Sequence, residues 1–299
     1  MQLITITGGQ TLHGRIRPAA AKNSVLPLLA ATLLCRTPSR LRAVPPLADV
    51  ATSLALLQSV GAKAERQGSD LFVAPGQDLQ GEIPDYLAGA MRSSVFYLAP
   101  LLCRVGEVRL PLPGGCKLGP RPVDIHLAGL AAMGAQVELE GIAVTLRRRG
   151  PLHGVDFALR LPSVGATMTL MMAATQAGGT TILRGAACEP EICDLANFLR
   201  ACGAHITGAG TPVVVIQGGK PLQGTAWTPL PDRIAAATYA AALACAGGEV
   251  TVTHCAPAYY AAFLDFLQAA GVDVARQDTT VTLARSPARP LRGGQTLWA

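Results

Sequence analysis

The chain is poor in charged and aromatic residues. Of its 299 residues, 15% are charged and 4% are aromatic, whereas charged residues make up about a quarter of an average globular chain. The formal net charge of +6 comes from basic residues that are dispersed and not interleaved with aromatic residues. This pattern argues against nucleic-acid binding. It remains compatible with a small polyanion, such as a phosphorylated metabolite, held in a cleft.

Long hydrophobic runs are also missing. The longest apolar stretches, such as "IAAATYAAALACA", fall short of the roughly eighteen residues that a membrane-spanning helix needs. The N-terminus "MQLITITGGQ" alternates like a strand and carries no basic leader followed by an apolar block. We therefore expect no secretory signal and a cytoplasmic location.

The eight cysteines are scattered and form no metal-binding pattern. Cys188 and Cys193 are separated by four residues, with no second cysteine pair or His-x-His partner nearby. We expect neither a zinc site nor a disulfide framework. Most of the other thiols lie in apolar helical sequence, where a buried thiol acts as a small hydrophobic group; they are Cys35, Cys103, Cys202 and Cys245.

What the chain does contain is a fourfold repeat. The copies "LALLQSVGAKAERQ", "LAGLAAMGAQVELE", "LANFLRACGAHITG" and "LDFLQAAGVDVARQ" each run from a helical pattern through glycine into a strand. The glycines recur at intervals of about seventy residues, at Gly61, Gly134, Gly203 and Gly271. Each is expected to end a helix in a left-handed conformation. Each repeat reads as helix–strand–helix–strand–strand, which predicts an α/β fold whose repeats pack around their own helices.

Polar residues mark the start of the first helix in each repeat. Backbone N–H groups and the positive end of the helix dipole make such a start a natural anion site. The alternative is a set of capped helix ends with solvated side chains. The residues concerned are Lys22, Asn23 and Ser24, then Arg92, then Ser163, Gly165 and Thr167, and finally Asp232 and Arg233.

The segment "LPLPGGCKLGPRPVDIH", residues 110–126, places a thiol in a loop rich in glycine and proline. Cys116 stands near Lys117 and Arg121, whose charges favour the thiolate form. Such a cysteine can donate or accept a proton, or attack an electrophile. The alternative is a cysteine that has no function in a surface loop.

These motifs together resemble the enolpyruvyl transferases, and among them the UDP-N-acetylglucosamine enolpyruvyl transferases. The resemblance covers nearly the whole chain and is carried by four segments, of which the one with the cysteine is highly specific. They are "GGQTLHGRIRPAAAKNSVLPLLAATLL", "GGCKLGPRPVDIHLAGLAAMGA", "PSVGATMTLMMAATQAGGTTILRGAACEPEICDLANFLRACGA" and "PDRIAAATYAAALA".

The resemblance implies transfer of the enolpyruvyl group of phosphoenolpyruvate to the 3-hydroxyl of UDP-N-acetylglucosamine, with release of phosphate. This is the first committed step of peptidoglycan precursor synthesis, and it implies no metal and no organic cofactor. Lys22 and Cys116 would be catalytic, with Cys116 as the proton donor and the thiol alkylated by fosfomycin. Lys22, Asn23 and Arg121 would bind phosphoenolpyruvate. The residues implied for UDP-N-acetylglucosamine are Arg92, Arg121, Pro122, Val123, Asp124, Ile125, Ser163, Val164 and Gly165.

The resemblance also implies an inside-out α/β barrel of six repeats in two domains, of which this sequence holds about four. Residues 22–229 would form a complete domain with the cysteine loop and the UDP-sugar site. Residues 1–21 and 230–299 would form part of a second domain, without its last two repeats. The family's catalytic aspartate, in a Thr-Asp-Met-Gln-like motif, would fall just beyond residue 299. We expect the partial domain to expose apolar surface and to self-associate.

Two other functions remain open at this stage. One is a non-catalytic nucleotide-sugar-binding protein built on the complete domain. The other is an enolpyruvyl transferase with a different acceptor, as in the shikimate pathway. Cys116 within "GGCKLGPRP" argues against the shikimate acceptor, because that relative lacks the cysteine loop.

Overall fold

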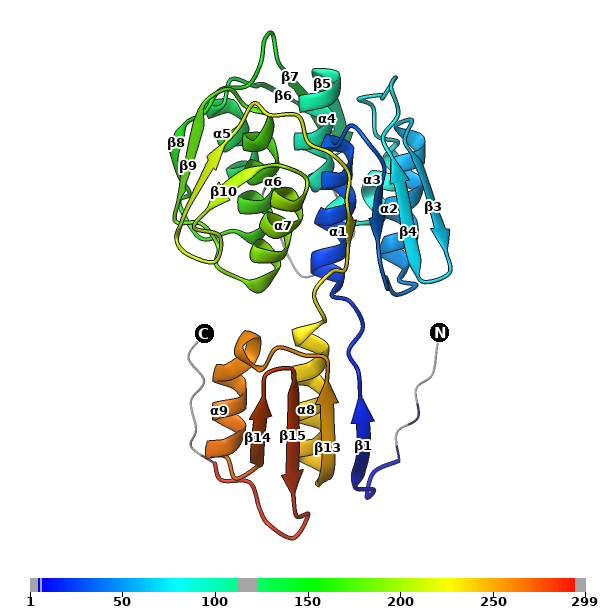
Figure 1. The fold of residues 1–299 in the computed structure, drawn as a ribbon, viewed down its shortest axis with the longest axis vertical. Helices are drawn as coiled ribbons and strands as arrows, with labels where there is room; N and C mark the ends of the chain where they lie inside the picture. Colours follow the sequence, from blue (N-terminus) through cyan, green and yellow to red (C-terminus); the bar gives the residue numbers. More distant parts are fainter. Residues whose placement is uncertain (1–4, 6, 112–122, 294–299) are drawn as a thin grey trace. The chain divides into compact units, whose positions relative to one another are not determined.

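The computed structural model describes residue 5, residues 7–111 and residues 123–293 (Figure 1). The chain divides into two compact units, which are described separately below. The large unit runs from Lys22 to Leu230, and the small unit combines residues 1–21 with residues 231–299.

The large unit contains three repeats, each with the predicted order of helix, strand, helix, strand, strand. The first comprises α1 (Lys22–Ala31), η1 (Thr32–Leu34), β2 (Ser39–Leu41), α2 (Ala48–Ser59), β3 (Lys63–Gln67) and β4 (Asp70–Ala74). The second comprises α3 (Asp85–Ala90), η2 (Arg92–Tyr97), α4 (Leu98–Val105), β5 (Glu107–Pro111), α5 (Asp124–Ala132), β6 (Gln136–Glu140) and β7 (Ala143–Arg147). After β8 (Asp156–Ala158), the third comprises α6 (Val164–Gln176), β9 (Thr180–Arg184), α7 (Pro190–Ala201), β10 (His205–Thr207) and β11 (Val213–Gln217), and β12 (Ala226–Trp227) follows.

Each repeat of the large unit forms its own sheet, with strand orders β12-β2-β4-β3, β5-β7-β6 and β10-β11-β9-β8. The segment before a repeat adds a parallel strand, as β8 does beside β9. The first repeat receives its parallel strand from the far end of the unit, because β12 pairs with β2. This pairing brings the segment that ends the unit beside the repeat that begins it.

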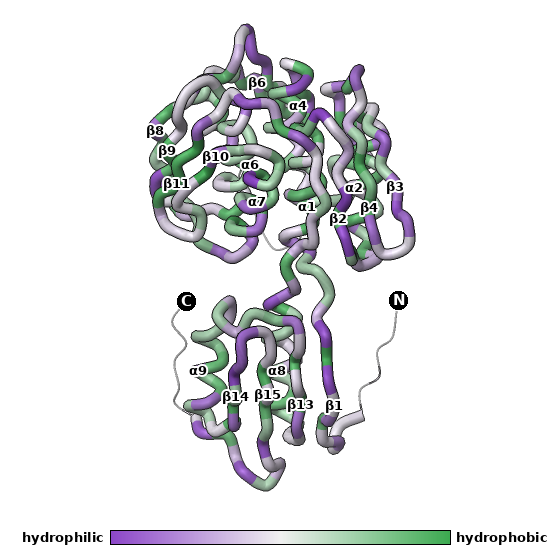
Figure 2. The backbone as a smooth tube through the Cα atoms, viewed as in Figure 1, coloured by the Kyte–Doolittle hydropathy of each residue, from purple (hydrophilic) through white to green (hydrophobic). Residues whose placement is uncertain are grey.

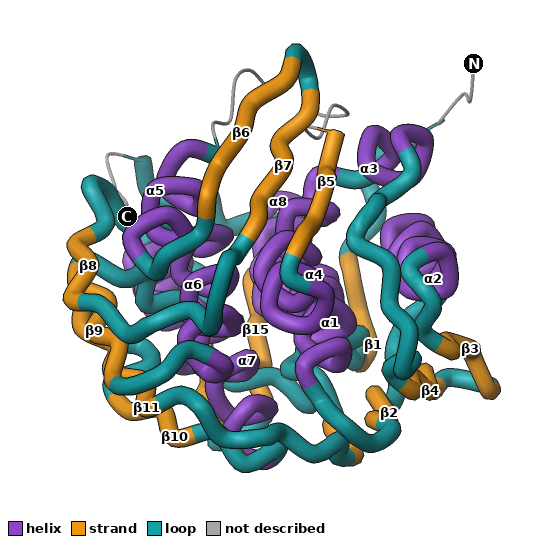
Figure 3. The backbone as a smooth tube through the Cα atoms, turned by 90° about the horizontal axis from the view of Figure 1, so that it is seen from above, coloured by secondary structure: helices purple, strands orange, loops and turns teal. Residues whose placement is uncertain are grey.

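The helices of the large unit lie between these sheets (Figure 3). Helix α4 packs against α6, and η2 contacts both α1 and α6. All residues of α1 from Ser24 to Ala31 are buried, as are those of α6 from Ala166 to Thr175. A helix that is apolar on every side belongs in a core, so the first helices of the three repeats form the centre of the unit. The predicted α/β repeat fold built around its own helices is confirmed.

The small unit contains the fourth repeat and one N-terminal strand. Its sheet has the order β1-β13-β15-β14, with β1 parallel to β13. In both units the strand inside the sheet is more hydrophobic than its neighbour at the edge, as β4 and β15 show beside β3 and β14 (Figure 2). The elements are β1 (Leu12–Ile16), α8 (Arg233–Ala246), β13 (Gly248–Thr253), η3 (Pro257–Tyr260), α9 (Ala261–Ala269), β14 (Asp273–Gln277) and β15 (Thr280–Arg285).

The glycines at the helix ends adopt the predicted left-handed conformation. Their φ angles are 92° at Gly61, 103° at Gly134, 106° at Gly203 and 101° at Gly271. Each donates its N–H to the carbonyl three residues earlier, at 2.9–3.0 Å. Side chains with a Cβ rarely adopt this conformation, so each repeat needs glycine to turn from its helix into its next strand.

The first helix of the second repeat is not one continuous α-helix. A 3-10 helix, η2, precedes α4. Pro100 has no N–H to donate to Phe96, so an unbroken α-helix through this stretch would lack one hydrogen bond. Ser94 of η2 is buried and donates to the carbonyl of Ala88 at 3.1 Å.

Among the described residues, no helix has the length and hydropathy to cross a bilayer.

Candidate active site

The predicted phosphoenolpyruvate residues of the first repeat lie at the start of α1. The Lys22 ammonium is 3.0 Å from a carboxylate oxygen of Asp49, which stands in the first turn of α2. The side chain of Lys22 is 50% exposed, and Asn23 is exposed as well. The end of a buried helix thus presents an ammonium and an amide to solvent, a combination suited to an anionic ligand.

Predicted UDP-sugar residues from three other helix starts meet around His126. The His126 ring is buried and lies 3.0 Å, through Nδ1, from the hydroxyl of Thr169. A Cβ added at Gly165 would come within 3.0 Å of the ring. Burial, with the nearby Arg92 charge, lowers the pKa of His126 to about 4, although the Asp124 carboxylate opposes this shift. The imidazole is therefore neutral at pH 7, and its contacts with Thr169 and Gly165 hold the start of α5 against α6.

Two polar groups at the same helix starts are already engaged. Asp124 forms a 2.5 Å ion pair with Arg160, and the hydrogen bond from this guanidinium lowers the pKa of Asp124. Ser163 caps α6, because its Oγ accepts the N–H of Ala166 at 3.3 Å. The hydroxyl proton of Ser163 can still be donated to a ligand.

Four of the residues discussed above lie outside the described residues. These are Cys116 and Lys117 of the cysteine loop, together with Arg121 and Pro122. The described chain stops at the end of β5, Pro111, and resumes at Val123, the N-cap of α5. The roles of these four residues stay predictions from the sequence.

The fourth repeat follows the simpler interpretation of its helix start. Asp232 caps α8, with its Oδ1 accepting the N–H groups of Ile234 and Ala235 at 2.9 Å each. This arrangement explains the aspartate without a ligand.

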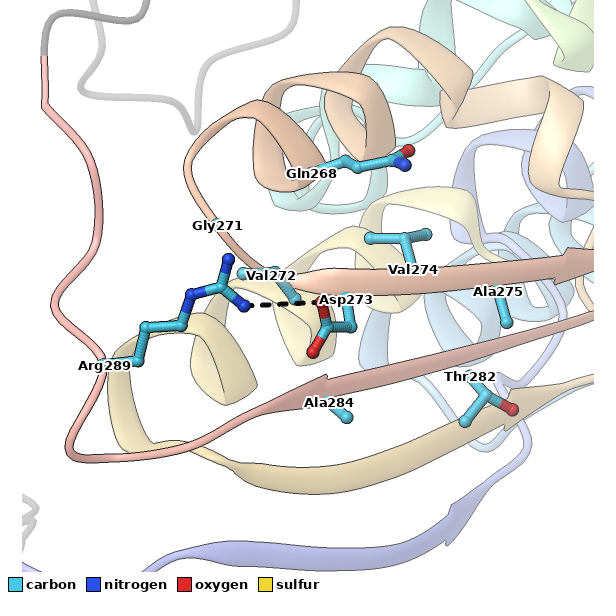
Figure 4. A pocket seen from close by; sticks show the side chains of 9 residues that line it. All are labelled: Gln268, Gly271, Val272, Asp273, Val274, Ala275, Thr282, Ala284 and Arg289. Atoms are coloured by element: carbon cyan, nitrogen blue, oxygen red, sulfur yellow. Dashed lines mark ion pairs between the residues drawn. The ribbon is translucent and has the colours of Figure 1, made fainter.

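Three hollows in the surface lie away from these helix starts and contain none of the predicted site residues. One has a volume of about 410 Å³ and is lined by β14, β15 and the end of α9, where Arg289 lies 3.5 Å from Asp273 (Figure 4). Similar hollows lie beside β3 and β4 and beside β10 and β11. Because they recur beside the edge strand of three repeats, we attribute them to the repeat geometry and not to ligand binding.

Among the described residues, no group of three or more His, Cys, Asp and Glu side chains could hold a metal ion.

The sequence interpretation missed three residues that touch the predicted site: His126, Arg160 and Asp194, the last of which accepts a hydrogen bond from Ser24. His126 and Asp194 stand among apolar helix residues, and a buried polar residue in an apolar helical pattern is the signal that could have marked them.

Comparison with known proteins assigns the chain to a family. The family model described as EPSP synthase (3-phosphoshikimate 1-carboxyvinyltransferase) matches residues 6–296. A UDP-N-acetylglucosamine 1-carboxyvinyltransferase of Cellvibrio japonicus is 42% identical over 291 residues, covering 97% of this chain and 69% of the relative. One of Desulfovibrio desulfuricans is 41% identical over 293 residues, covering 98% of this chain and 70% of the relative.

Solved structures agree on the fold. The enolpyruvyl transferase NikO from Streptomyces tendae matches with a TM-score of 0.83 at 24% identity, over 95% of this chain and 68% of that protein. EPSP synthase from Acinetobacter baumannii matches with a TM-score of 0.72 at 17% identity, over 91% of this chain and 64% of that protein.

Proposed function

The chain belongs to the EPSP synthase family of enolpyruvyl transferases, and on that premise we propose that it transfers the enolpyruvyl group of phosphoenolpyruvate to the 3-hydroxyl of UDP-N-acetylglucosamine. Phosphate is the second product, and the step leads toward peptidoglycan precursors in the cytoplasm. The observation that carries the proposal is 42% identity, over 97% of the chain, to a protein named for this transfer. The cysteine loop supports the same acceptor.

Lys22 and Asn23 would hold phosphoenolpyruvate. The ligand is an anion, and the Lys22 ammonium already pairs with the carboxylate of Asp49, so bound phosphoenolpyruvate would share or replace that partner. Protonation of the methylene carbon by Cys116 leaves an oxocarbenium-like centre at the neighbouring carbon. Fixed cations from Lys22 and Arg121 would offset the phosphate and carboxylate charge while this centre forms.

UDP-N-acetylglucosamine would lie against the helix starts around His126. Val164 and Gly165 stand in the first turn of α6, where backbone N–H groups face outward and favour an anion such as a diphosphate. Ser163 would donate its hydroxyl proton, and Arg92 would add a positive charge. All these residues belong to the large unit.

The proposed function is tested by measuring phosphate release from phosphoenolpyruvate. We expect release that requires UDP-N-acetylglucosamine and does not occur with either substrate alone. Release with shikimate 3-phosphate instead would identify the other acceptor class. Binding of UDP-N-acetylglucosamine without any phosphate release would favour the non-catalytic binding protein.

Replacing Lys22 with methionine is expected to raise the KM for phosphoenolpyruvate about 10- to 100-fold, because a hydrogen bond to a charged group contributes about 1.5–3 kcal/mol. The matched control is Lys63→Met, which removes an exposed lysine of β3 in the same unit. Equal KM values for the two variants would contradict the role of Lys22.

We also propose that the small unit self-associates through the outer face of α8. After Arg233 this helix contains no charged residue, and it leaves Ile234 51% and Tyr239 43% exposed. Cys245 is exposed too, so the expectation that its thiol is buried is wrong. Uncovered apolar helix faces promote association, and a second copy of the chain offers the same face.

The double variant Ile234→Glu/Tyr239→Glu should shift the protein toward monomer in light scattering across a concentration series. Ile142→Glu changes an exposed side chain of the large unit at the β6–β7 turn, 76% exposed, and serves as the control. A wild type that stays monomeric at high concentration would refute self-association.

A further inference from the structure

Asp194 is a buried carboxylate that accepts three hydrogen bonds from two segments of the chain, the start of α1 and residues 227–230. It lies on α7 and is only 7% exposed. Its Oδ2 accepts the hydroxyl of Ser24 and, at 3.2 Å, the backbone N–H of Leu230. Its Oδ1 accepts the indole N–H of Trp227 at 3.0 Å. Burial raises the pKa of Asp194, while the three donors favour its charged form.

The three donors lie close in sequence to the two points where the chain passes from one unit to the other. The polypeptide passes between the two units twice, at Ala21–Lys22 and at Leu230–Pro231. Ser24 follows the first passage by two residues, in the same helical turn as Lys22 and Asn23. Leu230 is the last residue before the second passage. One side chain therefore ties together both places where the chain enters and leaves the large unit.

The same two segments are also paired within the small unit. There the N–H of Asp232 donates to the carbonyl of Ala19 at 2.8 Å, and Ala20 forms a bridge with Pro231. The passages are thus held side by side by hydrogen bonds on each side. On the large-unit side the bonds to α1 and to Trp227 are made by side chains, and they converge on Asp194.

A role in packing alone does not account for this arrangement. Burying a carboxylate costs free energy that an apolar residue would not incur. The converging hydrogen bonds instead fix the positions of two segments, because one comes from α1 and two come from residues 227–230. Trp227 is further held by an edge-on contact with Phe198 of α7, with ring centroids 6.2 Å apart.

We propose that Asp194 is a positioning residue for the phosphoenolpyruvate site. It fixes the first turn of α1, which carries Lys22 and Asn23, relative to the connection formed by residues 227–230. The inference rests on the proposed function for the identity of the ligand, whereas the tether itself rests on the hydrogen bonds above.

The test compares Asp194→Asn with Asp156→Asn. Asp156 also forms an ion pair, with Arg184 in the large unit at 2.8 Å, but its side chain is 52% exposed. We expect Asp194→Asn to raise the KM for phosphoenolpyruvate at least fivefold and to leave the KM for UDP-N-acetylglucosamine within twofold of wild type. The selectivity is expected because the described UDP-sugar residues lie at the starts of η2, α5 and α6, whereas the hydrogen-bond donors to Asp194 lie on α1 and at residues 227–230. Asp156→Asn should leave both KM values unchanged.

Two single changes separate the tethers. Ser24→Ala removes only the bond to α1 and should reproduce the rise in KM for phosphoenolpyruvate, with no further rise when combined with Asp194→Asn. Trp227→Phe keeps an aromatic ring beside Phe198 and removes only the indole bond to Asp194, so the bond from the N–H of Leu230 remains. Hydrogen exchange of the amides of residues 24–26 and Leu28 in α1, and of Leu230, should accelerate in Asp194→Asn and not in Asp156→Asn.

Each outcome decides a different point. If the wild type is active and the folded Asp194→Asn variant has an unchanged KM for phosphoenolpyruvate, the positioning role is overturned. Equal rises in both KM values, or unchanged exchange, also overturn it, because they indicate general destabilisation or the absence of a tether. If the wild type neither binds phosphoenolpyruvate nor releases phosphate, the proposed function and the role of Asp194 in binding this ligand are both overturned. Faster hydrogen exchange in Asp194→Asn would then support only the structural tether between α1 and residues 227–230.

Discussion

Replacing Cys116 with serine is expected to lower kcat for phosphate release by about 10²- to 10⁴-fold, the usual contribution of a positioned general acid. A serine hydroxyl is a far weaker acid than a thiol, so it donates a proton to the methylene carbon of phosphoenolpyruvate less readily. The KM for UDP-N-acetylglucosamine should change little, since the thiol acts on the other substrate. Single-turnover measurement of phosphate release would show whether the chemical step has slowed.

Cys188→Ser is the control, because Cys188 is an exposed cysteine of the large unit outside the predicted site. It should retain wild-type kcat. A second measurement uses fosfomycin, whose epoxide should add covalently to Cys116 in the wild type and in Cys188→Ser, and not in Cys116→Ser, as read by peptide mass spectrometry. Full activity of Cys116→Ser would show that another group supplies the proton.

The features that the sequence predicts well are local. The turn at Gly61 and its counterparts depends on one residue and its own φ angle, so a repeated glycine pattern is enough to place four helix ends. The starts of α1 and α6 are similarly marked by short polar segments before apolar runs. These local signals establish the order of elements in each repeat, and the resemblance to a known family then supplies the architecture.

The features that the sequence does not predict depend on contacts between distant segments. Ser24 and Asp194 are 170 residues apart, and no periodicity in either helix indicates that they meet. The pairing of β12 with β2 joins the two ends of the large unit and is equally invisible in local patterns. The error at Cys245 has the same origin, since an apolar helix pattern does not reveal which of its faces another element covers.

His126 is expected to make folding stability fall as the pH decreases from about 6.5 to about 4. Its folded-state pKa is about 4, whereas a histidine in an unfolded chain has a pKa of about 6.5. Between these values the unfolded chain binds a proton that the folded chain does not, so acid favours unfolding. The stability that His126 contributes is complete above pH 6.5, and a difference of this size corresponds to about 3 kcal/mol lost near pH 4.

The measurement is urea unfolding of the protein at several pH values for wild type and His126→Asn, followed by tryptophan fluorescence, to which Trp227 of the large unit contributes. Wild type should lose about 3 kcal/mol more than His126→Asn over this range, and His205→Gln, which changes an exposed histidine of the same unit, should behave as wild type. Asp194 acts in the opposite direction, because its raised pKa makes the folded chain bind a proton more readily as the pH falls. The comparison between variants removes that contribution, which is common to both. Parallel stability curves for wild type and His126→Asn would show that His126 is not held neutral between α5 and α6.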